Sequence, residues 1–510
     1  MNETINGLEK LNASLEKCTQ YFLSSVKDLS SPIQIYTHID ADGLSAGAIL
    51  GKTLYREKIP FQMSILKQLE REEIEKIANN AKEKEVFIIF SDFGSGQYLE
   101  LQEKLLKIDK PVSFIVLDHH LPQNISNKED IDGIESILEK TSPWHINPYF
   151  FGIDGSYEIS GAGMCYYFAR SLNERNIDLS PIAIIGATGD IQNQGENKTF
   201  MGVNTSILND SINNGFIKVI NDLNFSLLKP LNEAIAYSTD FKLRGLSNDI
   251  NRTLKFLQTT GVLMENPDGD IKRLMDLNQK EKQQISTAII EYATIKLNIE
   301  PSDIIKKLIV NKYLLLREKQ FLELYETNHF AYVLNSCGRT NNGSLGIALA
   351  MGDRNSAYKQ AIEILNDYRK LLVEGLSWIY ENQKIQKKDN IQYFFGEDQI
   401  PESVIGVISS MLVFDNINDI DKKIPIFGIA KREGEEVYKI SGRAHESIVN
   451  KGVNLSDAIR RALELSNLDA LGGGHPPAAG TKIPINKIEE FLSNCDKIIK
   501  NQLNENNNDF

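Results

Sequence analysis

The stretch Ile33–Gly43, IQIYTHIDADG, joins a short apolar run directly to a histidine and two aspartates. Three more apolar runs end in the same manner: Val86–Ser91 before Asp92, Val112–Leu117 before Asp118-His119-His120, and Ile182–Gly189 before Asp190. Short apolar runs separated by helical segments are typical of buried strands in a parallel sheet. Ligands of such sheets bind beyond the carboxyl ends of the strands. We therefore predict a doubly wound α/β domain whose four polar clusters converge on one edge of the sheet.

The composition is that of a globular chain with more than one domain. With 510 residues, of which 41% are hydrophobic and 25% charged, the chain exceeds the size of one ordinary core, so two or three domains are expected. No apolar run reaches the roughly 18 residues that span a bilayer. The first residues lack the pattern of a secretory signal. Four widely spaced cysteines argue against a disulfide framework and favour a reducing cytoplasm.

The charge balance sets a condition on any nucleic-acid function. A formal net charge of −13 favours solubility and opposes nonspecific binding of phosphate. A nucleic-acid site must therefore depend on a local basic surface and on bound cations. We expect a cytoplasmic protein without membrane contact.

Four segments of the chain differ in their patterning. Residues 1–200 combine an amphipathic N-terminal helix with the alternating strands and helices of the α/β domain. Residues 201–304 have apolar residues at helical spacing, which predicts a helical connector or inserted subdomain. Residues 305–495 show a second, smaller α/β pattern, and residues 496–510 are predicted to form a polar tail. Strand candidates in the second pattern are 308–310, 313–316, 331–334, 424–430 and 437–440, with a long helix over 356–382.

Six residues of the first domain are candidate metal ligands: His38, Asp40, Asp42, Asp92, His119 and Asp190. Alternate residues of an extended segment share one face, so the three members of the first cluster can point into one pocket. Mixed oxygen and nitrogen donors suit Mn²⁺ or Mg²⁺ better than a thiolate-preferring metal. Two such ions about 3.5–4 Å apart would activate water and neutralise phosphate oxygens during in-line attack. His120 could then act on a phosphate oxygen or on the leaving group.

Each of these residues also has an ordinary structural explanation. A single aspartate after a strand is more often a helix cap or a turn residue, and a lone His-His pair is more often structural. All four clusters follow an apolar run at the point where a predicted strand ends, and this agreement favours a metal site.

A second group, near the C-terminus, is predicted to contact phosphate. Neighbouring glycines let the backbone approach a ligand closely, and an arginine presents a planar fork to phosphate. A glycine run alone is more often a flexible loop, but the His-Pro-Pro sequence that follows argues against mere flexibility. A surface salt bridge explains the first arginine of the group equally well. The candidates are Arg339, Arg443, His445, Gly472, Gly473, Gly474 and His475.

Together these motifs resemble the DHH–DHHA1 phosphoesterase superfamily over about residues 30–200 and 305–490. The chain length, the stretch Asn147–Gly155 and the helical insertion are most similar to the archaeal RecJ-like nucleases. The resemblance implies two metals, with Asp92 as the bridging ligand. One metal would be held by His38, Asp40 and Asp92, and the other by Asp42, Asp92, His119 and Asp190.

The resemblance also implies roles for the remaining residues. His120 would contact the scissile phosphate, and Asp118 would orient a neighbouring histidine. The C-terminal DHHA1 domain would hold the nucleic acid through Arg443, His475 and the glycines. Archaeal members are associated with the GINS complex of the replicative helicase, which suggests a partner by analogy.

The leading hypothesis is a Mn²⁺- or Mg²⁺-dependent exonuclease for single-stranded DNA or RNA in replication or repair, with the strand passing between the two domains. One alternative is a phosphodiesterase for short oligoribonucleotides or dinucleotides. Another is a replisome scaffold that binds GINS and has secondary nuclease activity. A metal-dependent pyrophosphatase is disfavoured by the glycine run and Arg443. The complete set of metal motifs favours an active enzyme, whereas polarity and the choice of DNA or RNA do not follow from the sequence.

Overall fold

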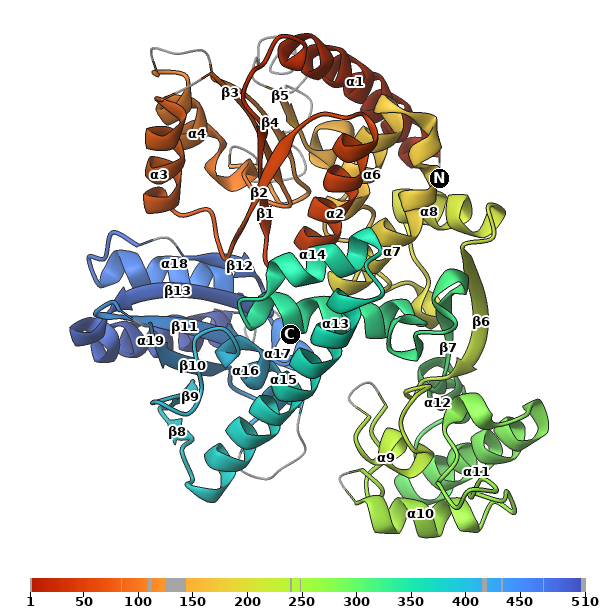
Figure 1. Ribbon diagram of the computed structural model, residues 1–510. Helices are drawn as coiled ribbons and strands as arrows, with labels where there is room; N and C mark the ends of the chain where they lie inside the picture. The colour runs from red at the N-terminus through yellow and green to blue at the C-terminus, as the bar shows by residue number, and fades with distance from the viewer. Residues whose placement is uncertain are drawn as a thin grey trace. The chain divides into compact units, whose positions relative to one another are not determined.

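The computed structural model describes residues 2–83, 85–108, 112–123, 144–238, 241–247, 249–414, 420–432, 434–470 and 472–505. Two compact units, Met1–Ile364 and Leu365–Phe510, meet within helix α15 (Ser356–Glu381). Figure 1 shows the elements of both units.

A five-stranded parallel sheet with the order β2-β1-β3-β4-β5 forms the centre of the first unit. The strands are β1 (Ile33–His38), β2 (Phe61–Leu66), β3 (Val86–Ser91), β4 (Val112–Leu117) and β5 (Trp144–Ile146). Strands β1, β3 and β4 confirm three of the four predicted strands. Because β1 lies between β2 and β3, the strand order reverses there, and ligands of such sheets bind at this switch point.

Helices cover both faces of this sheet (Figure 1). One face carries α1 (Asn2–Val26), α2 (Ala41–Arg56) and α6 (Gly161–Leu172), and the other carries α3 (Arg71–Ala81) and α4 (Tyr98–Leu105). Alternate residues of β3 serve the two faces: Phe90 belongs to the core under α3 and α4, whereas Phe87 packs on Phe22 of α1. Burial on both faces explains why the strands are continuous apolar runs.

The fourth predicted strand, over 182–189, is wrong. Residues Ser180–Gly189 form helix α7, and Asp190 caps that helix instead of ending a strand. The helix packs against α2 and α6 and is buried almost throughout, so its sequence has no polar face to reveal a helical period. The predicted strand over 331–334 is also wrong, because these residues lie within helix α13 (Thr327–Arg339). Most of them are buried there, so they form a short apolar run that resembles a strand.

The predicted helical insertion is largely helical, but two strands that pair with each other flank it. After α8 (Gly202–Asn213), strand β6 (Ile217–Leu223) pairs antiparallel with β7 (Ile309–Leu315). The helices between them surround a core of their own, which includes Leu231, Leu257 and Ile289. They are α9 (Leu231–Ala236), α10 (Ile250–Gln258), α11 (Gln279–Leu297) and α12 (Pro301–Leu308).

Residues 305–364 lie in the first unit, although the sequence pattern assigns them to the C-terminal domain. Helices α13 and α14 (Gly343–Met351) pack against α2, where Leu44 lies beside Gly346. The apolar face of a helix does not specify which core it joins, so the sequence pattern alone cannot place this boundary.

The second unit contains a six-stranded sheet with the order β12-β13-β11-β10-β9-β8. Helix α16 (Ile405–Phe414) packs on β10 and β11, and α18 (Leu455–Leu465) and α19 (Ile488–Glu505) form the core of the other face with Phe427 and Ile459. Helix α19 includes residues 496–505 of the predicted tail, and residues 506–510 lie outside the described residues. The strands are β8 (Gln386–Lys387), β9 (Gln392–Phe395), β10 (Ile426–Lys431), β11 (Val437–Arg443), β12 (Gly473–His475) and β13 (Ala478–Pro484).

Candidate metal centre

The six predicted ligands gather at the carboxyl edge of the parallel sheet. His38 ends β1, Asp92 follows β3, His119 lies just beyond β4, and Asp190 caps α7. The expected extended segment through His38, Asp40 and Asp42 is only partly correct. Helix α2 begins at Ala41, so Asp40 is its N-cap and Asp42 reaches the centre from its first turn.

Three overlapping groups of ligand-type atoms lie in this centre: Asp92, Asp118, His119 and His120 form one, and the other two form separate sets. His38, Asp40 and Asp92 offer atoms within 4.8 Å of one another, and so do Asp42, His119 and Asp190. Nδ1 of His38 is 2.9 Å from Oδ2 of Asp40 and 3.5 Å from Oδ2 of Asp92. Oδ1 of Asp92 is 3.2 Å from Nε2 of His119. Asp92 therefore presents one oxygen to each set.

Several buried polar atoms of the centre make no hydrogen bond. They are Nδ1 of His38, both carboxylate oxygens of Asp92 and Nε2 of His119. Asp92 is 2% exposed and His119 is 4% exposed, so water does not satisfy these atoms fully. A buried carboxylate without hydrogen-bond donors is costly unless a cation compensates it. Because carboxylate oxygens and imidazole nitrogens are ligands for divalent cations such as Mn²⁺, the residues present fit divalent cations.

Neutral groups hold the two carboxylates of the second set. At the start of α6, the amides of Gly161 and Ala162 donate to Asp42 at 2.6 and 3.0 Å. A β-carbon on Gly161 would lie 2.6 Å from Oδ1 of Asp92, so this close approach requires glycine. Gln192 donates to Asp190 at 2.8 Å. Gly161 and Gln192 are absent from the predicted site; the only sequence signal for them is their place at a helix start and beside Asp190.

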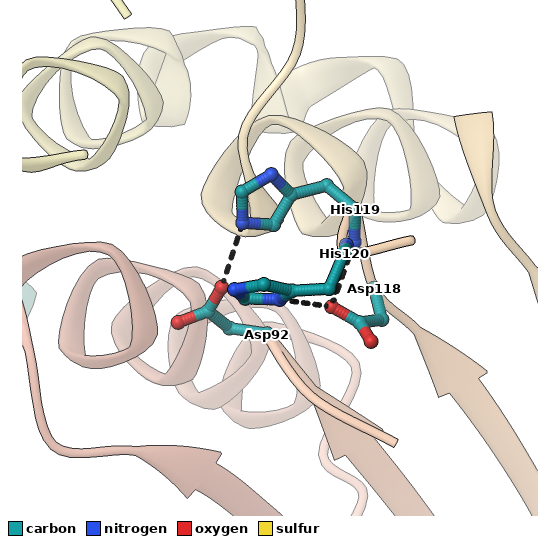
Figure 2. A group of neighbouring side chains, drawn as sticks. All are labelled: Asp92, Asp118, His119 and His120. Carbon is teal, nitrogen blue, oxygen red and sulfur yellow. Dashed lines mark hydrogen bonds and ion pairs between the residues drawn. The ribbon is translucent and has the colours of Figure 1, made fainter. Parts of the chain in front are cut away.

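The two histidines after β4 are held in different ways. Nδ1 of His119 hydrogen-bonds to the carbonyl oxygen of Gly155 at 2.7 Å, which turns Nε2 toward Asp92. Nδ1 of His120 hydrogen-bonds instead to Oδ1 of Asp118 at 2.8 Å. Figure 2 shows the contact of His119 with Asp92 and the bond of His120 to Asp118. Asp118 also accepts the amide of Ser95 at 2.9 Å, so both of its oxygens accept hydrogen bonds from neighbouring groups.

The crowding of acids changes proton affinities in the centre. Burial, with a further contribution from Asp92, raises the pKa of Asp190 to about 6. Burial and Asp92 also raise the pKa of Asp42 well above its usual value. Burial alone would lower the pKa of His119, but Asp190 and the other carboxylates outweigh it and raise that pKa. Binding of cations would therefore displace protons from this cluster.

Helix α13 contributes to the first set from a distant part of the sequence. Oδ1 of Asn335 accepts the amide of Ala41, the first residue of α2, at 3.0 Å. A β-carbon on Gly338 would lie 1.7 Å from the carbonyl oxygen of Ile39, so α13 packs directly on this loop. Burial raises the pKa of Asp40, but His38, with Arg339 contributing, lowers it below its usual value. The structure thus brings the predicted Arg339 close to the centre.

The other predicted substrate residues lie in the second unit. Arg443 at the end of β11 and His475 at the end of β12 are both in register with Ala478 of β13. Residues directly opposite one another share a face of the sheet, so the arginine and the histidine project from the same face. Nε of Arg443 donates to the hydroxyl of Ser410 at 2.8 Å.

The structure alters the expectations for the glycine run and for His445. Gly473 and Gly474 belong to strand β12, so the predicted phosphate-binding loop is partly a strand, with Gly472 just before it. Strand β12 lies at the edge of the sheet and pairs only with β13, and Leu471 lies outside the described residues. His445 caps the short helix α17 (Glu446–Val449) and accepts the amide of Ser447 at 3.2 Å.

Comparison with known proteins agrees with this arrangement of domains. The chain matches the DHH family, N-terminal domain over residues 32–189, the DHH-CID domain over 227–309 and the DHHA1 domain over 390–501. It is 32% identical over 497 residues to an uncharacterized protein of Methanocaldococcus jannaschii, a match that covers 97% of this chain and 99% of that protein.

Three solved structures share the fold at low sequence identity. CDC45 from Entamoeba histolytica has a TM-score of 0.62 at 12% identity, covering 96% of this chain and 99% of that one. An exonuclease RecJ bound to manganese has a TM-score of 0.51 at 16% identity, covering 96% and 94%. RecJ from Thermus thermophilus in complex with Mn²⁺ has a TM-score of 0.54 at 15% identity, and the match covers 96% of this chain but only 55% of that protein.

The parallel sheet with its acidic edge, the helical insertion and the mixed sheet correspond to the matched DHH, DHH-CID and DHHA1 domains. The chain belongs to the DHH family. Family and acidic cluster together support a metal-dependent phosphoesterase. Within the described residues, no helix has both the length and the apolar character needed to cross a membrane.

Proposed function

We propose that this protein is a two-metal phosphodiesterase that removes nucleotides from single-stranded DNA or RNA. The observation that carries the proposal is the position of Asp92, whose two oxygens make no hydrogen bond and face two separate sets of ligand atoms. A pair of bound Mn²⁺ or Mg²⁺ ions would supply an activated water and neutralise charge on the phosphate. One ion would be held by His38, Asp40 and Asp92, and the other by Asp42, Asp92, His119 and Asp190.

His120 is the proposed proton donor to the phosphate or the leaving oxygen. Burial and His119 lower its pKa, but Asp118 and Asp92 outweigh them and raise it above the usual value. The side chain is 45% exposed, so it is accessible to a substrate. Asp118 stays ionised because His120 and the amide of Ser95 outweigh the effect of burial and lower its pKa. Asp118 therefore fixes the orientation and the charge of the imidazole.

Substrate binding is proposed to involve basic residues in both units. Arg339, close to Asp40, would contact a phosphate next to the centre. Arg443 and His475 would contact another part of the nucleic acid from the sheet of the second unit. The resemblance to archaeal RecJ-like nucleases supports a partner of the GINS type, and the DHH-CID region over 227–309 is the segment to test for that contact.

The decisive experiment uses single-stranded DNA and RNA labelled at the 5′ or the 3′ end, with Mn²⁺, with Mg²⁺ and with chelator. We expect metal-dependent shortening that Asp92→Asn abolishes. Asp268→Asn is the matched control, because Asp268 is an exposed residue of a turn in the insertion. Absence of cleavage for every substrate and metal would overturn the proposal and favour a scaffold.

The acidic charge balance favours a second candidate, a phosphodiesterase for short oligoribonucleotides or dinucleotides. A net charge of −13 repels a long polyanion more strongly than a dinucleotide. Comparison of kcat/KM for substrates of two and of about twenty nucleotides separates the two activities. A preference for the longer substrate supports the exonuclease.

A further inference from the structure

Ile191, the residue after Asp190, has a backbone conformation that is unusual for its type. Its φ angle is 57°, in the left-handed region that β-branched residues rarely adopt. The residue is 65% exposed, so burial of its side chain does not compensate the strain. A β-branched apolar residue is therefore held in an unfavourable conformation at the surface, directly beside the acidic centre.

The end of helix α7 explains the backbone conformation but not the choice of residue. The amide of Gln192 donates to the carbonyl of Ala187 at 2.9 Å, and that of Ile191 donates to Thr188 at 3.1 Å. This pair of bonds is the Schellman arrangement, which normally has glycine or asparagine at the left-handed position. The same chain uses glycine in the same arrangement at the end of α14, where Gly352 has a φ angle of 113°.

Two more exposed apolar side chains lie next to groups of the centre. Leu121 follows His120 and is 54% exposed. Tyr157 is 43% exposed and lies two residues beyond Gly155, whose carbonyl holds the ring of His119. Groups that touch the acidic centre thus come with exposed apolar neighbours on three separate segments.

We propose that Ile191 is a specificity residue that packs against the nucleoside of the nucleotide whose phosphate lies at the acidic centre. The inference rests on the proposed function, since it concerns the same site. An aliphatic side chain contacts a sugar or the face of a base without hydrogen bonds, so it accepts every base. It also favours a nucleotide over a phosphate ester that lacks a nucleoside. Leu121 and Tyr157 are further exposed apolar residues on segments that contribute to the centre.

The chemistry of the remaining neighbours supports an apolar role. Asp190 and Gln192, on either side of Ile191, are already bound to each other at 2.8 Å, and Gln192 also donates to the carbonyl of Gly155 at 2.9 Å. These polar groups are committed to the centre, so the side chain of Ile191 is the part of this segment that remains for contact with a nucleoside.

The test compares Ile191→Gly with Ile191→Val on two single-stranded DNA substrates, one intact and one with an abasic terminal nucleotide. For Ile191→Gly we expect the ratio of kcat/KM for the intact over the abasic substrate to fall about tenfold, whereas Ile191→Val keeps the ratio within about twofold. Thermal unfolding should show that Ile191→Gly is at least as stable as the wild type, because glycine relieves the left-handed strain. Leu263→Ala, another exposed aliphatic residue at 73%, is the control for loss of surface apolar area.

Titration of the same variants with Mn²⁺ alone separates the possible failures. Unchanged Mn²⁺ affinity together with the altered ratio supports the proposal. An unaltered ratio for Ile191→Gly overturns it. A loss of Mn²⁺ affinity with equal losses on both substrates also overturns it, because Ile191 would then act by positioning Asp190. If the wild type cleaves neither substrate, the proposed nuclease function itself fails, and the inference falls with it.

Discussion

The acidic centre of the first unit and the end of the sheet in the second unit differ in how their side chains are held. In the first, Asp92 and Asp118 are at most 2% exposed, and amides or imidazoles fix the surrounding carboxylates. In the second, His475 is exposed, and Arg443 bonds to Ser410 and to its own neighbour's carbonyl. Both regions are candidates for binding phosphate, yet these side chains of the first are buried, whereas those of the second are partly or fully exposed.

The difference follows from the charges that each region must hold. Carboxylates repel one another, so a cluster of them stays in place only when the backbone and neutral donors fix each member before a cation arrives. A guanidinium on a flexible side chain can reach phosphate from the surface without such prearrangement. Changes in the first region should therefore affect chemistry, and changes in the second should affect affinity.

The largest expected effect is that of Asp92→Asn. Loss of the shared carboxylate should lower kcat at least about 10³-fold and weaken Mn²⁺ binding at both sites. The metal-free variant should nevertheless unfold at a higher temperature than metal-free wild type, because the repulsion between Asp92 and the neighbouring Asp42 and Asp190 is removed. Activity, Mn²⁺ titration and thermal unfolding check the three parts. A variant that loses stability without metal would contradict the view that Asp92 is held at a cost for cation binding.

Replacement of His120 should separate proton transfer from cation binding. We expect His120→Gln to lower kcat by about 10²-fold while Mn²⁺ affinity stays close to that of the wild type, since Nδ1 of His120 is bound to Asp118. Asp118→Asn should produce part of the same loss, because the imidazole is no longer oriented. A large drop in Mn²⁺ affinity for His120→Gln would show that this histidine is a ligand.

The buried surroundings of the acidic centre should also make the stability of the fold depend on pH. Burial lowers the pKa of His145 from 6.5 to about 4, and its Nε2 is 2.8 Å from the hydroxyl of Ser95. The unfolded chain binds this proton more tightly than the folded one. The contribution of His145 to the free energy of unfolding is therefore complete above about pH 6.5. It falls by about 3 kcal/mol as the pH drops to about 4.

Chemical denaturation of the wild type and of His145→Gln across this pH range measures the effect. The free energy of unfolding of the variant should depend less steeply on pH than that of the wild type, since glutamine does not titrate. Equal slopes for the two proteins would show that His145 is already protonated in the folded state.

The smallest expected effect belongs to the second unit. Arg443→Lys should raise KM for single-stranded oligonucleotides about fivefold and leave kcat nearly unchanged, because lysine keeps the charge but loses the planar fork. Salt should weaken binding of wild type and variant alike. A fall in kcat larger than the rise in KM would contradict the expectation that the second region affects affinity and the first affects chemistry.

Much of the first region could be predicted from sequence alone. Strands β1, β3 and β4 are recognisable because parallel strands buried on both faces are continuous apolar runs. Polar residues directly after such strands must meet at one edge, so the group of His38, Asp92 and His119 followed from strand positions without any contact being known. The resemblance of the motifs to DHH and DHHA1 proteins made the same assignment more specific.

Contacts between distant segments determined the rest. The run over 182–189 could equally be a strand or a helix, and it became helix α7 because it packs against the helices α2, α6, α8 and α13. The Gly161 amide of α6 is 119 residues from its partner Asp42, and Asn335 of α13 is 294 residues from its partner Ala41 at the start of α2. Residues 305–364 joined the first unit, and Gly473 and Gly474 joined a strand, for the same reason. Local pattern specifies which residues are apolar and where charges gather, whereas the choice of packing partner depends on the shape of the whole folded chain.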